Sequence, residues 1–183
     1  RDHDEIIVTA TGKSEAISTT KSATPIIESA QSISIINRDE MELRGSATIA
    51  DALSYTAGVQ AEPSGIDSRT DEVSVRGFGA GGFSSNNNFV DGLRLPSGGQ
   101  WTRTGFDTFA LQQIEVLKGP SGALYGQTAP GGVVNIVTKR PTDTFHAEFM
   151  LQAMGTTDLD NWNGEAAVDV GGPISSTLSA RVV

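Results

Sequence analysis

The sequence predicts an α+β domain with a small mixed sheet and short helices, followed by a run of antiparallel strands. Two segments typical of strands, 114–118 and 133–138, flank a turn region rich in glycine and proline. Short helical patterns alternate with short strand patterns in residues 32–61. After Pro141 the pattern changes to alternating apolar and polar residues over segments of roughly ten residues.

Composition limits the class of protein. The chain has 183 residues, enough for one domain or one domain with an extension. It has no cysteine, which excludes disulfides and thiolate sites, and its formal net charge of −9 argues against nucleic acid as the main partner. No run approaches the ~18 apolar residues of a membrane helix. The first five residues lack the order of a signal peptide, so we expect a mature chain if the protein is exported.

The N-terminal part begins with a polar segment, residues 1–24, which we expect to be flexible. A strand is predicted over 32–36. The helices that should follow are assigned by their capping residues. The first is capped by Asn37 or Asp39, runs through Glu42 and ends near Gly45; the second is capped by Ser46, with Gly58 just past its end.

The middle of the chain consists of short strands joined by two long loops. Strands are predicted over 59–61, 73–76 and 89–90, and a helical turn over 107–112 precedes the next strand. The loops cover residues 77–88 and 94–104. Loops of this length in a compact domain are usually functional or disordered.

The stretch 113–141, QIEVLKGPSGALYGQTAPGGVVNIVTKRP, has the most distinctive pattern. A half-buried strand ends at Lys118, because Pro120 fixes φ and has no N–H to donate. A helical turn over 123–125 is closed by Gly126. After the glycine turn at 131–132, residues 133–138 are rich in β-branched side chains and predict a strand buried on both faces.

In the C-terminal part, apolar and polar residues alternate along 145–153, 162–170 and 177–182, with connections expected at 155–161 and 172–175. This alternation is typical of transmembrane β-barrel strands and equally of an antiparallel meander packed on a soluble core. The residues alone leave both open.

No catalytic or metal motif is found. Residues 77–82 match G-x-G-x-x-G, but 83–88 form a poor helix, and a dinucleotide loop needs a helix there. His3 and His146 lie far apart with no ligand spacing. We therefore expect no enzyme, no cofactor and no metal bound by the protein.

The stretch 113–141 resembles the late plug segment of TonB-dependent outer-membrane receptors of the ferric-siderophore type. The segments V-R-G-F at 75–78 and V-D-G at 90–92 resemble plug motifs of the same family. The resemblance implies an α+β plug domain over 25–141, a flexible segment over 1–24, and the first antiparallel strands of a transmembrane β-barrel over 142–183. Such barrels have about 22 strands, so these residues would supply only the first few.

The resemblance also implies a TonB box, the segment that the periplasmic energy-coupling protein TonB binds. It comprises Glu5, Ile6, Ile7, Val8, Thr9 and Ala10. A β-prone island on a polar tether can add as a strand to a partner's sheet edge.

A ferric siderophore is the implied ligand, held by apical loops. The implied contact residues are Arg76, Phe83, Gln100, Trp101 and Arg103. Arginine suits an anionic ferric complex and the aromatic rings suit its apolar faces. The alternative for Arg76 is a structural salt bridge between plug and barrel wall. Lys118 occupies a position where the family often has an arginine that pairs with barrel glutamates.

The implied location is the bacterial outer membrane, with the plug inside the barrel lumen, the N-terminus periplasmic and the barrel facing lipid. Cobalamin, haem or another chelate is an alternative ligand. A soluble binding or adhesion domain that uses the glycine-rich loops is an alternative of a different class.

Overall fold

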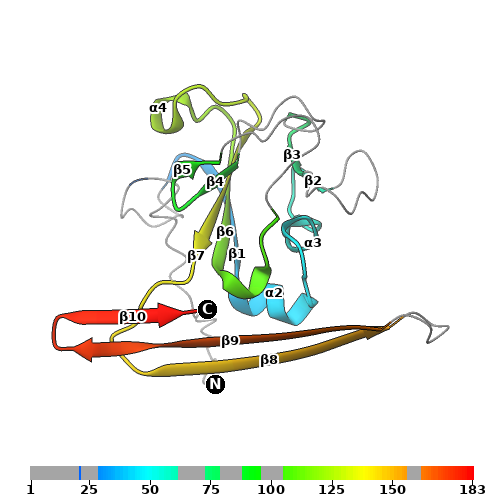
Figure 1. Ribbon diagram of the computed structural model, residues 1–183. Coiled ribbons are helices and arrows are strands. Elements are labelled where there is room, and N and C mark those ends of the chain that lie inside the picture. Colours follow the sequence, from blue (N-terminus) through cyan, green and yellow to red (C-terminus); the bar gives the residue numbers. More distant parts are fainter. Residues whose placement is uncertain (1–20, 22–28, 62–72, 79–87, 96–104, 156–161) are drawn as a thin grey trace, which may run out of the picture.

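The computed structural model describes residue 21 and residues 29–61, 73–78, 88–95, 105–155 and 162–183 (Figure 1). Their strands form three sheets: a five-stranded sheet in the order β1-β6-β7-β4-β5, a three-stranded sheet in the order β10-β9-β8, and the pair β2-β3. We call the first the central sheet and the second the C-terminal sheet. In Figure 1 the long strands of the C-terminal sheet lie across one end of the central sheet, next to α2.

The central sheet is mixed, as predicted. Its strands are β1 (Ser32–Asn37), β6 (Leu111–Lys118), β7 (Gly132–Thr138), β4 (Asn88–Val90) and β5 (Leu93–Arg94). The β1–β6, β6–β7 and β4–β5 pairs are antiparallel, whereas β4 pairs with β7 in parallel. The predicted burial of β7 on both faces is confirmed, because its residues from Gly132 through Val137 are all buried.

The prediction that β6 is half-buried is wrong. Residues 114–117 are all buried, including the Glu115 carboxylate. One set of β6 and β7 side chains joins a core with α2, α3 and β3, while Leu117 and Val133 pack with Phe89 and Tyr125 in a second core. Two separate cores on this sheet explain why apolar residues occur at both parities.

The helices are short and are positioned by their caps. In α2 (Arg38–Arg44) the Asn37 side chain accepts from the Glu40 N–H, and Gly45 ends the helix in the left-handed conformation, as expected. The predicted start of the second helix is wrong. Helix α3 (Ile49–Leu53) is capped by Thr48, whose hydroxyl accepts from the Asp51 N–H while the Asp51 carboxylate accepts from the Thr48 N–H.

Ser46 lies before this capping box, and Gly58 belongs to the turn that leads into β2 (Val59–Ala61), with φ of +75°. β2 pairs with β3 (Val73–Val75). The helical turn predicted at 107–112 is shorter in the structure: the 3₁₀ helix η2 (Thr108–Ala110) leads into β6, which already begins at Leu111. The predicted helical turn after β6 is present as α4 (Gly122–Tyr125).

The C-terminal sheet is antiparallel and consists of β8 (His146–Gly155), β9 (Trp162–Ser175) and β10 (Leu178–Val182). Apolar side chains such as Phe149, Leu151 and Val168 are exposed on one face, while Asp169 on the other is fully buried. These strands fit the start of a barrel. The connection predicted at 172–175 is wrong, because β9 continues to Ser175 and the turn follows it. Among the described residues, no helix has the length and apolarity needed to cross a membrane.

Candidate functional site

Arg76 is the predicted ligand residue that the structure describes, and it lies in a tight turn between β3 and Phe78. The Val75 N–H donates to the Phe78 carbonyl at 2.8 Å, and the Phe78 N–H donates back at 3.0 Å. Arg76 and Gly77 both have positive φ, +52° and +79°. Such a turn favours Asn or Gly at its first central position, so an arginine there is strained. Strain of this kind is often found at functional sites.

Glycines allow the chain to pack closely behind this turn. A Cβ on Gly131 would lie 2.0 Å from the Val75 carbonyl oxygen and 2.9 Å from Phe78 Cβ. A Cβ on Gly119 would lie 3.3 Å from Arg76 Nη1. The Gly119 N–H also donates to the Gly131 carbonyl at 2.7 Å, which joins the two backing segments. The P-G-G segment at 130–132 therefore packs directly against the Arg76 turn, through Gly131.

A second cation lies beside Arg76. Burial and the neighbouring charge of Arg76 lower the pKa of the Lys118 ammonium, which also donates to Ser34 Oγ at 2.7 Å. Within the described parts of the chain, no carboxylate forms an ion pair with either residue. Two adjacent cations can attract an anion, either a ligand group or a carboxylate from elsewhere.

The turn at 91–92 precedes the second predicted loop. Asp91, with φ of +49°, accepts from the Thr138 N–H at 3.1 Å and from its hydroxyl at 2.7 Å. The Gly92 N–H donates to the buried Asn135 side chain at 2.9 Å. The V-D-G and V-N segments are thus tied together across β4 and β7.

The other predicted site residues lie outside the described residues. They are Phe83, Gln100, Trp101 and Arg103 of the loops and Glu5, Ile6, Ile7, Val8, Thr9 and Ala10 of the predicted TonB box.

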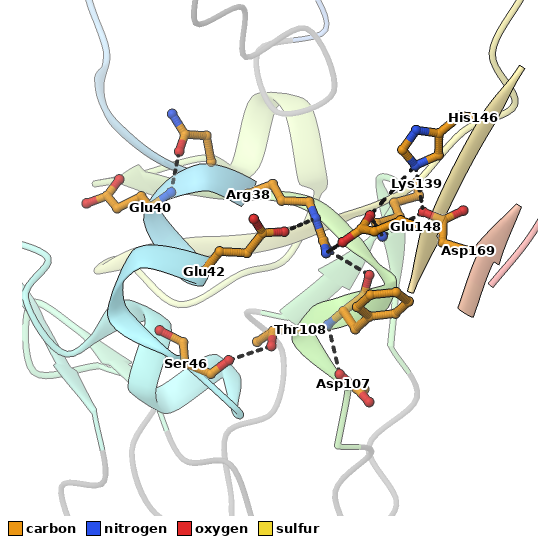
Figure 2. Close-up of polar contacts among 12 residues, drawn as sticks. Arg38, Glu40, Glu42, Ser46, Asp107, Thr108, Lys139, His146, Glu148 and Asp169 are labelled. Carbon is orange, nitrogen blue, oxygen red and sulfur yellow. Dashed lines mark hydrogen bonds and ion pairs between the residues drawn. The ribbon is translucent and has the colours of Figure 1, made fainter. Parts of the chain in front are cut away.

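A cluster of charged residues that the sequence analysis did not identify lies between the central sheet and the C-terminal sheet (Figure 2). Lys139 follows directly after β7, and its ammonium is 2.7 Å from Asp169 Oδ2 on β9 and 3.3 Å from Glu148 Oε2 on β8. The Lys139 side chain is 1% exposed and that of Asp169 is 0% exposed. The pair is therefore shielded from water.

Arg38, the first residue of α2, reaches the same cluster. Its Nη2 is 2.5 Å from Glu148 Oε1, its Nε is 2.5 Å from Glu42 Oε1, and its Nη1 donates to the Phe109 carbonyl at 2.8 Å. The guanidinium carbon lies 4.9 Å from the centre of the Phe109 ring, and Lys139 Nζ lies 4.0 Å from the same ring. The Phe109 ring thus makes a cation–π contact with each of the two cations.

Arg181 on β10 completes the cluster from the C-terminal sheet itself. Its Nε donates to Asp169 Oδ1 at 2.7 Å and its Nη1 donates to the Arg140 carbonyl at 3.0 Å. Arg181 pairs across the sheet with Gly171, where a Cβ would lie 3.0 Å from Arg181 Cγ. Because Gly171 has no side chain, the Arg181 side chain has room to reach Asp169.

His146, Glu148 and Asp169 have ligand atoms within 4.8 Å of one another, a spacing that could hold a metal ion. However, the two carboxylates already bond to Lys139, Arg38 and Arg181. A divalent cation would add positive charge beside these three and would have to displace them. The cluster is better suited to joining protein segments than to binding a metal.

The alternating pattern could have indicated part of this cluster, because it assigns Glu148, Asp169 and Arg181 to the polar face of their strands. It could not indicate that Glu148 and Asp169 lie opposite each other, or that Lys139 and Arg38 meet them.

Comparison with known proteins gives consistent matches. Residues 25–133 match the model of the TonB-dependent Receptor Plug Domain. The chain is 45% identical over 163 residues to the ferrioxamine receptor of Yersinia enterocolitica, covering 82% of this chain and 23% of that protein. It is 39% identical over 140 residues to the ferrichrome outer membrane transporter/phage receptor of Escherichia coli K12, covering 76% of this chain and 18% of that protein.

Among solved structures, the closed form of the ferric-catecholate import receptor Fiu of E. coli K12 matches with a TM-score of 0.73 and 27% identity, over 93% of this chain and 22% of that one. The alcaligin outer membrane receptor FauA of Bordetella pertussis matches with a TM-score of 0.70 and 27% identity, over 96% of this chain and 29% of that one. The chain spans about a quarter or less of the length of the curated relatives it matches.

Proposed function

This chain belongs to the TonB-dependent receptor plug domain family, and from that membership we propose that it forms the plug and first barrel strands of an outer-membrane transporter for a ferric siderophore. The relatives with higher identity are named for ferrioxamine and ferrichrome, those with lower identity for catecholates. We therefore expect a ferric complex of the ferrioxamine or ferrichrome kind rather than cobalamin or haem.

One observation carries this proposal beyond family membership. The face of the C-terminal sheet that meets the central sheet is charged, while the opposite face exposes Phe149, Leu151 and Val168. A barrel wall that faces lipid outside and a polar plug inside needs this distribution. A soluble binding or adhesion domain does not need an exposed apolar face on its long strands, so this alternative is not favoured.

The division of the chain follows from the same proposal. Residues 1–24 are the tether with the TonB box, 25–141 the plug inside the lumen, and 142–183 the first wall strands in the outer membrane. The tether is on the periplasmic side, and the Arg76 turn with the loops after it faces the external ligand. Nucleic acid has no role, and no cofactor is needed because no bond is made or broken.

Transport then uses two separate parts of the chain. The apical loops capture the ferric complex, with Arg76 contacting its anionic or polar edge and Trp101 its apolar face. TonB binds residues 5–10 by strand addition and pulls, which remodels the plug. The energy of the proton-motive force reaches the site as mechanical work.

The test is uptake by the full-length receptor in a host that lacks its own siderophore receptors. Accumulation of radioactive iron is measured for ferrioxamine B, ferrichrome, a ferric catecholate and haem, with labelled cobalamin assayed in parallel and a host without TonB as control. We expect TonB-dependent accumulation from ferrioxamine B or ferrichrome. Accumulation of haem or cobalamin alone would show that the proposed ligand class is wrong. Accumulation that does not depend on TonB would contradict the mechanism.

A further inference from the structure

The C-terminal sheet contains an unfavourable pair of like charges. Glu148 on β8 and Asp169 on β9 are directly opposite each other in the antiparallel register, so both side chains project from the same face. Like charges directly opposite destabilise a sheet. We call these two residues the acidic pair.

Three cations compensate the acidic pair, and two of them come from the plug. Lys139 contacts both members, and Arg38 contacts Glu148 (Figure 2). Of these cations only Arg181 belongs to the C-terminal sheet, and it bonds to Asp169. His146 on β8 also faces the acidic pair, with its Nε2 3.7 Å from Glu148 Oε2 and 3.6 Å from Asp169 Oδ2. The charge balance of the first barrel hairpin therefore depends on the plug being in place.

The two plug cations differ in how firmly they are held. The Lys139 side chain is almost fully buried against Asp169 and the Phe109 ring, and the Lys139 backbone N–H donates to the Ala110 carbonyl at 3.2 Å. Arg38 is shared between Glu148, which is 28% exposed, and Glu42, which is 53% exposed. Removing one partner of a buried pair is far more disruptive than removing one partner of an exposed pair.

We propose that the acidic pair binds the Lys139 ammonium, and that this contact holds the end of the plug sheet at the barrel wall during transport. We call this contact the latch. The proposal rests on the transporter function above. The connection between the two parts is short, because Lys139 follows directly after β7 and only residues 140–145 lead from it into β8. Remodelling of the plug would then occur in elements other than the β7 end, which stays with the wall.

The test uses the full-length receptor purified in detergent, with Lys139→Met compared with Arg140→Met. Arg140 is the adjacent cation, its side chain is exposed, and the backbone carbonyl that accepts from Arg181 is kept in the variant. For Lys139→Met we expect a lower thermal midpoint and hydrogen exchange at least about tenfold faster in peptides covering 139–148, because the hairpin opens more readily without its counter-ion. Arg140→Met should match the parent receptor in both measurements.

A second variant separates the charge effect from lost packing. Adding Glu148→Gln to Lys139→Met removes the like-charge opposition, so slow exchange and the thermal midpoint should recover in part. A Lys139→Met receptor that behaves like Arg140→Met would overturn the latch. A double variant no more stable than Lys139→Met would do so as well, since it would leave only a packing role for Lys139.

Neither measurement needs a ligand or TonB. A receptor that imports none of the tested complexes would overturn the transporter function and leave the stability comparison intact. The two proposals can therefore fail separately.

Discussion

At the scale of single residues, Arg76 combines backbone strain with a charge. Its φ of +52° is a conformation that glycine adopts without cost, yet the turn has an arginine there and places it beside Lys118. Arginine is unfavourable at this position of the turn, and Arg76 has no ion-pair partner among the described residues. We therefore infer that its guanidinium makes contacts with groups other than the described residues.

Replacing Arg76 tests that role. Arg76→Ala and Arg76→Gly should both weaken binding of the ferric complex by about 1–3 kcal/mol, the range for losing a charged hydrogen bond. Arg76→Gly also relieves the turn, so its thermal midpoint should equal or exceed that of Arg76→Ala. Binding is measured on intact cells with surface levels matched. Unchanged affinity in both variants would leave Arg76 with a structural role only.

Gly131 is a residue at which the close approach of the Val75 carbonyl leaves no room for a side chain. Gly131→Ala would put its methyl group 2.0 Å from the Val75 carbonyl oxygen, so the Arg76 turn must shift. We expect a loss of about 1–3 kcal/mol in stability of the full-length receptor, as for other overpacked sites. The measurement is the free energy of unfolding from denaturant titration.

Gly122→Ala is the matched control for Gly131→Ala. A Cβ at Gly122 meets nothing within 4 Å, and the residue lies in α4, where alanine is the better helix former. This control should be neutral or slightly stabilising. Equal effects of the two substitutions would contradict the close approach at Gly131.

At the scale of elements, β7 is the strand on which the plug depends. It lies in the interior of the central sheet between β6 and β4, and its side chains contribute to both cores. A strand with no exposed face cannot accommodate a charge on either side.

Ile136→Asp should therefore prevent the plug from folding. An unpaired carboxylate at this buried position costs several kcal/mol, comparable with the whole stability of a domain. The yield of protease-resistant plug in the full-length receptor measures the effect. Leu43→Asp, on an exposed face of α2, is the control and should leave that yield unchanged. A normal yield from Ile136→Asp would show that the strand tolerates a charge and would contradict its interior position.

At the scale of the whole molecule, ligand capture and energy coupling are expected in separate parts of the chain. The Arg76 turn lies in the folded plug, whereas the proposed TonB box is at residues 5–10. Strand addition uses main-chain N–H and C=O groups, so it depends little on which side chains are present.

Proline substitutions in the box should separate the two functions. Ile7→Pro or Val8→Pro removes a backbone donor and fixes φ, so energy-dependent accumulation should be abolished while surface binding of the ferric complex survives. Ile7→Ala keeps the backbone donor and should transport normally. Binding and accumulation are measured on the same strain. Normal accumulation by the proline variants would exclude this segment, and joint loss of both activities would indicate misfolding.

Local sequence pattern determined much of the fold of this chain. It predicted β1, α2, β7 and α4 closely, as well as the alternation of the C-terminal strands, because each depends on residues within a few positions of one another. The identity of the family was likewise carried by a contiguous stretch, 113–141. The start of α3 was missed because Ser46 and Thr48 are both good capping residues, and only the reciprocal bonds of Thr48 with Asp51 distinguish them.

Tertiary structure decided what depends on residues far apart in the chain. Glu115 on β6 is buried although the sequence predicted a half-buried strand, because β6 lies between β1 and β7 and both of its faces are covered. The strained turn at Arg76 is held by Gly131, more than fifty residues away. The acidic pair meets Lys139 only because strand register sets Glu148 opposite Asp169 and the end of β7 is placed beside them. Register and docking are set by long-range packing, and alternation along a single strand carries no information on either.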